Sequence, residues 1–196
     1  MSDEEDLAGL IASRICHDLI SPVGALGNGL ELLSLSVDPE GEEMALIRDC
    51  AAAAAAGLSF MRIAFGAAAD GGVSLREVSA TATRYLHARK VELVWPDNGG
   101  DISRRDAKER FLLLLAASDA LPRGGRIEPS ADAPGGWLGE GVDRRPEIPR
   151  EKFAKRREDM APGEAHYALL KRIGEASGRR LHIEDGPSES LEIAMR

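Results

Sequence analysis

Apolar residues recur in the first part of the chain at a spacing close to the 3.6 residues of an α-helical turn. The members of this stripe are Leu7, Ile11, Ile15, Leu19, Leu26, Leu30 and Leu33. The stripe predicts one long amphipathic helix over about residues 2–35, with one buried face. A second helix is predicted to begin near Asp38-Pro39, a cap followed by proline, and to continue through the alanine run at 51–56 to about Gly66.

The short connection between these two segments predicts an antiparallel helical hairpin. Two helices alone cannot enclose a core. We therefore expect a homodimer in which two hairpins form a four-helix bundle. The alternative is that the hairpin packs on the rest of its own chain.

Beyond Gly71-Gly72 the pattern changes to a mixture of helical and strand-like segments. The predicted helices are 75–89, 103–120, 151–159 and 164–177, and the predicted strands are 91–95, 126–128, 137–138, 181–184 and 191–195. This order predicts an α+β sandwich with helices on one face of a mixed sheet. The expected domains are a helical hairpin over 1–70 and an α/β domain over 73–196.

Composition narrows the classes of partner. A net charge of −8 and a pI of about 5.1 argue against binding to nucleic acid or to an anionic membrane. The longest apolar run, 111–117, is too short to cross a bilayer, and the acidic N-terminus does not resemble a secretion signal. Cys16 and Cys50 are too few for a disulfide framework. We expect a cytoplasmic protein.

His17 is the strongest candidate for chemistry in the hairpin. At about 100° per residue it lies roughly 200° around the helix from Ile15 and from Leu19, so its imidazole is predicted to face water. Pro22 follows five positions later, where a proline normally removes a helical hydrogen bond, yet the apolar stripe continues past it. An exposed histidine, an adjacent acid and a tolerated proline suit a helix that can be phosphorylated.

A histidine-bearing hairpin followed by an α+β domain resembles the core of sensor histidine kinases. In that family a dimerisation and phosphoacceptor hairpin precedes an ATP-binding domain. Residues 17–22, with the sequence His-Asp-Leu-Ile-Ser-Pro, are similar to the family's histidine box.

The segments that resemble the ATP site depart from the kinase pattern. Leu115 and Asp119 stand where kinases have magnesium-binding asparagines, and Arg145 and Glu147 stand where they have glycines. Only one glycine, Gly163, remains in the segment that resembles the glycine-rich lid. Side chains at such positions prevent backbone amides from holding phosphates, and carboxylates repel a triphosphate.

An intact histidine box beside a degenerate ATP site resembles the ChpT-type histidine phosphotransferases, as do residues 62–67. The resemblance implies a dimeric relay protein without ATP-dependent kinase activity. His17 would take a phosphoryl group from the receiver domain of an upstream hybrid histidine kinase and pass it to an aspartate of a downstream response regulator. The chain itself would need no cofactor or metal, since the receiver's acidic pocket supplies Mg²⁺.

The same resemblance suggests roles for the neighbours of His17. Asp18 is expected to orient the imidazole or hold its other proton, the alternative being a solvated helix charge. Arg14 and Ser21 share a helix face with His17 by their spacing, and either contact the phosphoryl group or a receiver, or are ordinary surface residues. The basic residues at 144–145 and 152–157 either steer an acidic receiver or are simply solvated.

Three other functions fit parts of this pattern. An active soluble sensor histidine kinase would require nucleotide binding. A non-catalytic dimeric adaptor that binds receiver domains would leave His17 without a role. An unrelated helical-hairpin regulator would lack a four-helix bundle.

Overall fold

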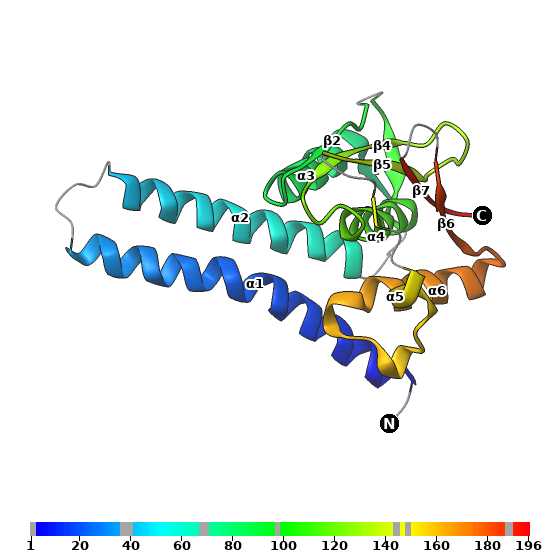
Figure 1. Ribbon diagram of the computed structural model, residues 1–196, viewed down its shortest axis with the longest axis horizontal. Helices are drawn as coiled ribbons and strands as arrows, with labels where there is room; N and C mark the ends of the chain where they lie inside the picture. Colours follow the sequence, from blue (N-terminus) through cyan, green and yellow to red (C-terminus); the bar gives the residue numbers. More distant parts are fainter. Residues whose placement is uncertain are drawn as a thin grey trace.

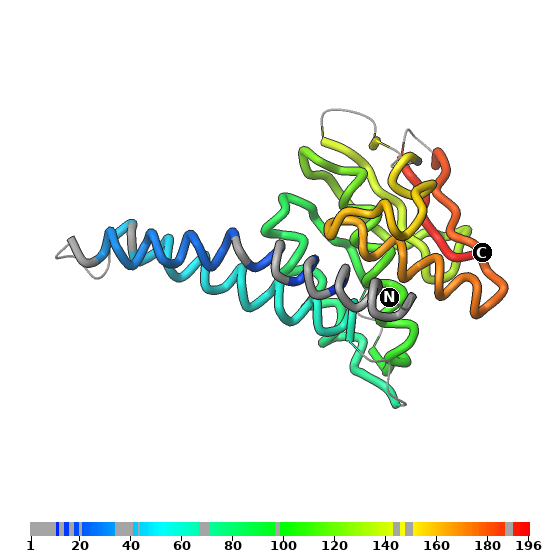
Figure 2. The backbone as a smooth tube through the Cα atoms, turned by 90° about the horizontal axis from the view of Figure 1, so that it is seen from below, coloured from blue at the N-terminus to red at the C-terminus, as the bar shows by residue number. Residues whose placement is uncertain are grey.

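The computed structural model describes residues 3–35, 41–66, 71–96, 99–142, 146–147, 150–186 and 190–196. Its first two helices, α1 (Asp3–Leu35) and α2 (Glu42–Phe65), pack along each other as an antiparallel hairpin (Figure 1). Helix α1 continues through Pro22, as the apolar stripe predicts. In both Figure 1 and Figure 2 the Leu35 end of α1 extends far from the C-terminal part of the chain, while the opposite end of the hairpin lies against it.

The C-terminal part contains two sheets. The smaller pairs β1 (Gly72–Ser74) antiparallel with β3 (Asp101–Ser103). The larger has five strands in the order β2 (Val91–Leu93), β4 (Gly125–Pro129), β5 (Trp137–Gly141), β7 (Leu191–Met195) and β6 (Leu181–Asp185). Strands β2 and β4 are parallel and the other neighbours are antiparallel, so this sheet is mixed.

Three helices pack against the five-stranded sheet: α3 (Leu75–His87), α4 (Arg104–Asp119) and α6 (Ala165–Ser177). The short helix α5 (Arg150–Ala154) and the 3₁₀ turns η1 (Arg157–Asp159) and η2 (Pro162–Glu164) lead into α6. Local chemistry sets the helix ends. The Ser103 hydroxyl accepts the Asp106 amide at 3.0 Å at the start of α4, and Gly178 ends α6 in the left-handed conformation with φ 69°.

The hairpin and the C-terminal part share one hydrophobic core. Phe60 of α2 is fully buried, and its ring centroid lies 3.9 Å from that of Tyr85 on α3 and 4.5 Å from that of Phe111 on α4. Met61 and Ala64 of α2 are also buried. The last turns of α2 are therefore part of the core of the C-terminal domain.

The sequence pattern predicts most of these elements correctly. The hairpin, the three longer C-terminal helices and the five strands of the mixed sheet are confirmed, with shifts of a few residues at their ends. The predicted helix at 151–159 is instead the short α5 followed by η1. Strands β1 and β3 were not predicted, because each is a three-residue segment with one apolar residue that runs directly into the following helix. Asp38-Pro39 lie outside the described residues, and α2 begins at Glu42 after Gly41.

By length and composition, the segment Met44–Phe65 of α2 could cross a membrane. Only 17% of its most apolar 18-residue stretch is buried within the protein. The sequence pattern did not single this segment out. In the structure it forms half of the hairpin and ends in the shared core.

Replacing Phe60 by Ala should lower the free energy of unfolding by about 3–5 kcal/mol, because the substitution leaves a cavity beside the two aromatic rings of Tyr85 and Phe111. Urea denaturation followed by circular dichroism measures the change. Val142→Ala is the control, since Val142 is 68% exposed and its truncation should change the unfolding free energy by less than about 0.5 kcal/mol. A loss below about 1 kcal/mol for Phe60→Ala would contradict the shared core.

Candidate phosphoacceptor site and the contacts of its helix

Helix α1 carries His17 in its first half, next to Asp18, which contacts Tyr85 and Arg89 of the C-terminal domain. The side chains of Cys16 and His17 lie outside the described residues. The exposure of the imidazole therefore stays a prediction from the helical period. The described neighbours, Arg14, Asp18 and Ser21, define its surroundings.

The surface that follows His17 along α1 is open. Ser21, one turn later, is exposed. Gly24 is exposed as well, and a Cβ added to Gly24 or Gly27 would meet no atom within 4 Å. Small residues on an exposed helix leave room for another protein element to approach the backbone closely.

Within the described part of the chain, at least three donors hold Asp18. Its Oδ2 accepts hydrogen bonds from Arg14 Nε at 3.2 Å, Tyr85 Oη at 3.0 Å and Arg89 Nη2 at 3.0 Å. The Asp18 side chain is only 7% exposed, so it is not a solvated helix charge. Tyr85 lies on α3 and Arg89 follows its last turn, so this contact joins α1 to the C-terminal domain.

Arg14 also faces inward. Only 3% of the surface of Arg14 is exposed, and its Nη1 donates a hydrogen bond to the carbonyl oxygen of Gly163 in η2. Burial opposes the charge, but Asp18 and Tyr85 outweigh this effect and raise the pKa of Arg14. Arg14 is therefore not an ordinary surface residue. A contact with a phosphoryl group would require it to give up these two internal interactions.

Sequence reasoning did not identify Tyr85, Arg89 or Gly163 as neighbours of Asp18. One signal was present: Tyr85 and Arg89 are four residues apart, which places an arginine over an aromatic ring on one helix face. The Arg89 guanidinium carbon lies 4.6 Å from the Tyr85 ring centroid. The partner of such a pair on another helix cannot be read from local spacing.

The segments that resemble an ATP site are filled by the protein's own side chains. Asp119, at the end of α4, accepts a hydrogen bond from Lys152 Nζ at 3.3 Å and lies 3.7 Å from Nε2 of His166. Burial raises the pKa of Asp119, although Lys152 and Arg14 lower it. His166 is fully buried, with its ring centroid 4.1 Å from that of Tyr167.

The segment that resembles the lid is also fixed in place. Both carboxylate oxygens of Glu164 accept hydrogen bonds from Lys155 Nζ at 2.9 Å, and Oε2 accepts the Ala161 amide at 2.9 Å. Gly163 is held against Arg14 of α1. Of the other predicted departures, Arg145 lies outside the described residues, whereas Glu147 is exposed and its amide donates to the Ala120 carbonyl at 2.9 Å.

Comparison with known proteins agrees with this architecture. Residues 75–189 match the family described as "Histidine phosphotransferase C-terminal domain". The chain belongs to the histidine phosphotransferase family.

Two relatives extend the comparison. The protein phosphotransferase ChpT of Brucella abortus (strain 2308) is 44% identical over 124 residues, which cover 62% of this chain and 59% of that protein. The match thus spans less than two thirds of the relative. A solved structure described as a 1.7 Å structure of a bacterial phosphotransferase is 30% identical with a TM-score of 0.80, and the match covers 100% of this chain and 98% of that one.

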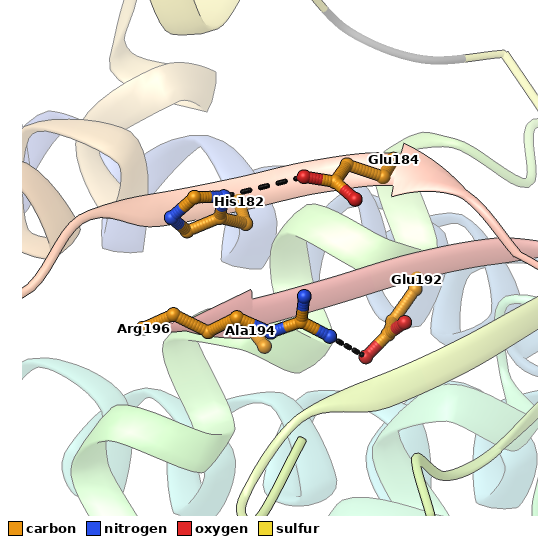
Figure 3. Close-up of a pocket in the computed structure, with 5 residues that line it drawn as sticks. All are labelled: His182, Glu184, Glu192, Ala194 and Arg196. Atoms are coloured by element: carbon orange, nitrogen blue, oxygen red, sulfur yellow. Dashed lines mark hydrogen bonds and ion pairs between the residues drawn. The ribbon is translucent and has the colours of Figure 1, made fainter. Parts of the chain in front are cut away.

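A hollow in the C-terminal sheet of this chain offers less chemistry. Figure 3 shows a shallow hollow on β6 and β7, where His182 Nδ1 lies 3.3 Å from Glu184 Oε1 and Arg196 Nη2 lies 2.6 Å from Glu192 Oε1. These side chains pair with one another rather than converging on a common point. Among the described residues, no group of three or more His, Cys, Asp and Glu side chains is arranged to hold a metal ion.

The burial of His166 should make the stability of the protein depend on pH. Burial, followed by the nearby Arg14, Lys152 and Arg89, lowers the pKa of His166 well below its ordinary value. Below about pH 6.5, His166 binds a proton in the unfolded chain but not in the folded protein. The unfolding free energy should therefore fall by up to about 1.4 kcal/mol for each unit by which the pH is lowered.

The His166→Phe variant should lose this part of the pH dependence, because it removes the titrating ring. Urea denaturation at pH 5.5 and pH 7.5 gives the difference for each protein. The control is His182→Gln. Because the His182 side chain is 40% exposed, this substitution should leave the difference in unfolding free energy between the two pH values as in wild type. An undiminished difference in His166→Phe would show that other groups cause it.

Proposed function

We propose that this protein is a histidine phosphotransferase of a phosphorelay and that His17 is its phosphoryl carrier. The observation that carries the proposal is the position of His17 on the hairpin of a member of this family. The chain has four histidines. Of the others, His166 is fully buried, and His87 and His182 belong to the C-terminal domain.

In the proposed reaction a neutral ring nitrogen of His17 attacks the phosphorus of a phospho-aspartate in a receiver domain. A phosphorus–nitrogen bond forms, the bond between phosphorus and the aspartyl oxygen breaks, and the aspartate leaves as a carboxylate. The phosphoryl group then moves to the aspartate of a second receiver by the same step in reverse. Mg²⁺ belongs to the receiver in each step. The neutral imidazole is the nucleophilic form, because one of its ring nitrogens carries a free lone pair.

The open surface of α1 beyond His17 suits a docking receiver. Ser21 is exposed one turn from His17, where its hydroxyl would donate a hydrogen bond to the phosphoryl group. Gly24 and Gly27 leave space for a receiver helix. The proposed partners are the receiver domain of an upstream hybrid histidine kinase and downstream response regulators in the cytoplasm.

We also propose that residues 1–70 form a homodimeric four-helix bundle and that residues 73–196 form a degenerate ATPase-like domain attached to it. The hairpin exposes large apolar side chains, namely Val23 (56%), Leu30 (57%), Leu32 (49%), Leu46 (46%) and Leu58 (56%). A groove of about 460 Å³ between α1 and α2, with Ile11, Ile15, Leu58 and Phe65 in its lining, extends this apolar surface. A second hairpin would cover both.

The filled ATP-like region supports transfer without ATP hydrolysis. A nucleotide there would have to displace the Lys152–Asp119 and Lys155–Glu164 ion pairs and the buried ring of His166. A titration with ATP separates this proposal from that of an active kinase. Stoichiometric binding would favour the kinase.

His17→Ala should abolish phosphorylation of the protein by a phosphorylated receiver, because the nucleophile is removed. The measurement is acid-labile, base-stable label on the protein after incubation with ³²P-labelled receiver. His87→Ala is the matched control, since His87 is an exposed helix histidine and its loss should leave labelling intact. Full labelling of His17→Ala would overturn the assignment and favour an adaptor role.

Leu30→Glu combined with Leu46→Glu should convert the dimer to monomer, because two buried charges per chain cost several kcal/mol at the dimer interface. Sedimentation equilibrium gives the mass. The control exchanges Val142, an exposed apolar residue of the C-terminal domain, for Glu and should stay dimeric. A monomeric wild-type protein would rule out the bundle.

A further inference from the structure

The Asp18 carboxylate links two parts of the chain. The same carboxylate oxygen accepts hydrogen bonds from α1 itself, through Arg14, and from the C-terminal domain, through Tyr85 and Arg89. Asp18 directly follows His17 in the chain. The residue beside the proposed phosphoryl carrier is thus one of the points at which polar contacts attach the C-terminal domain to α1.

Burial makes this attachment strong. The side chains of Arg14 and Asp18 are 4% and 7% exposed, and Tyr85 is 5% exposed. Hydrogen bonds that involve charged groups are about twice as strong as neutral ones, and exclusion of water strengthens them further. Burial raises the pKa of Tyr85 and Asp18 raises it too, although Arg89 and Arg14 lower it, so the hydroxyl stays protonated and keeps donating.

The contacts spread from Asp18 to three other parts of the chain. Arg14 donates onward to the Gly163 carbonyl of η2. The Tyr85 ring stacks on the ring of Phe60 in α2. The guanidinium carbon of Arg89 lies 4.6 Å from the centroid of the Tyr85 ring. One carboxylate therefore connects α1 with α3, with the lid-like segment and, through Tyr85, with α2.

We propose that Asp18 is a positioning residue, which locks the C-terminal domain against the phosphoacceptor turn of α1 and so shapes the surface on which receivers dock. The inference rests on the proposed function. In this role Asp18 acts through Tyr85 and Arg89 on the arrangement of the two domains. A role in orienting the imidazole would instead lower the rate at which His17 accepts a phosphoryl group from any donor, including one that needs no docking surface.

The energetic consequence concerns binding of the receiver. When only a fraction of molecules has the domains in the docking arrangement, the apparent dissociation constant rises by the inverse of that fraction. The maximal transfer rate at saturating receiver is unaffected, because the docked molecules all have the correct arrangement. Loss of the Asp18 contacts should therefore raise the apparent KM and spare the maximal rate.

The test uses two variants on the C-terminal domain, Arg89→Ala and Tyr85→Phe, with Arg84→Ala as control. Arg84 is an exposed arginine on the same helix, α3. Transfer from a phosphorylated receiver is measured over a range of receiver concentrations. We expect the apparent KM to rise roughly 5- to 30-fold for Arg89→Ala, the effect of losing one partly buried charged hydrogen bond, and less for Tyr85→Phe.

Phosphoramidate, a small phosphodonor that needs no docking surface, provides the second measurement. Arg89→Ala and Tyr85→Phe should accept phosphoryl groups from phosphoramidate at the wild-type rate. Asp18→Asn should raise the apparent KM at least as much as Arg89→Ala. The double variant that combines Asp18→Asn with Arg89→Ala should have no higher an apparent KM than Asp18→Asn alone. Unchanged KM values in both Arg89→Ala and Tyr85→Phe, with impaired transfer in Asp18→Asn, would overturn the proposal.

Hydrogen exchange separates failure of this inference from failure of the proposed function. Backbone amides in 84–90 and 160–166 should exchange faster in Arg89→Ala than in wild type and Arg84→Ala, whether or not His17 accepts phosphate. A wild-type protein that no phosphodonor labels would refute the phosphoryl-transfer function. Unchanged exchange in Arg89→Ala would refute the lock. Tyr85→Phe removes a single hydroxyl, so it keeps the test valid should Asp18→Asn fail to fold.

Discussion

The stacking of Phe60 between Tyr85 and Phe111 is the interaction on which the rest of the structure depends. A hairpin of two helices cannot bury its apolar residues alone, and here the last turns of α2 share the core of the C-terminal domain. Because the hairpin is antiparallel, the end of α2 lies beside the first half of α1. The same packing therefore brings the C-terminal domain next to the turn that carries His17.

Polar contacts then give this apolar attachment a defined orientation. Tyr85 takes part in both the apolar and the polar contacts, because its ring belongs to the core and its hydroxyl donates a hydrogen bond to Asp18. Arg14 extends the contact to Gly163, in the segment that resembles a nucleotide lid. In this chain that segment contacts the phosphoacceptor helix, and Asp119 and Glu164 are paired with lysines of the same region. A region that resembles an ATP site has thus become part of the scaffold around α1.

Periodicity predicted the elements well, because α1, α2 and the buried strands each have one apolar face over many residues. It also placed Arg14 and Ser21 on the helix face of His17; Ser21 is exposed and Arg14 is buried, and the exposure of His17 stays a prediction. It could not decide whether Arg14 and Asp18 are site residues or surface charges, and the structure shows both side chains buried. Their partners, Tyr85 and Arg89, are about 70 residues away, and only the tertiary packing of α2 on α3 brings them together.

The position of the phosphoryl group tests the central claim most directly. Trypsin cleaves after Arg14 and Arg48 and releases residues 15–48, in which His17 is the one histidine. Mass spectrometry of this peptide at neutral to basic pH, after incubation of the protein with a phosphorylated receiver, should show the mass of one phosphoryl group on His17. A phosphoryl group on a peptide that contains His87, His166 or His182, or on none, would contradict the account.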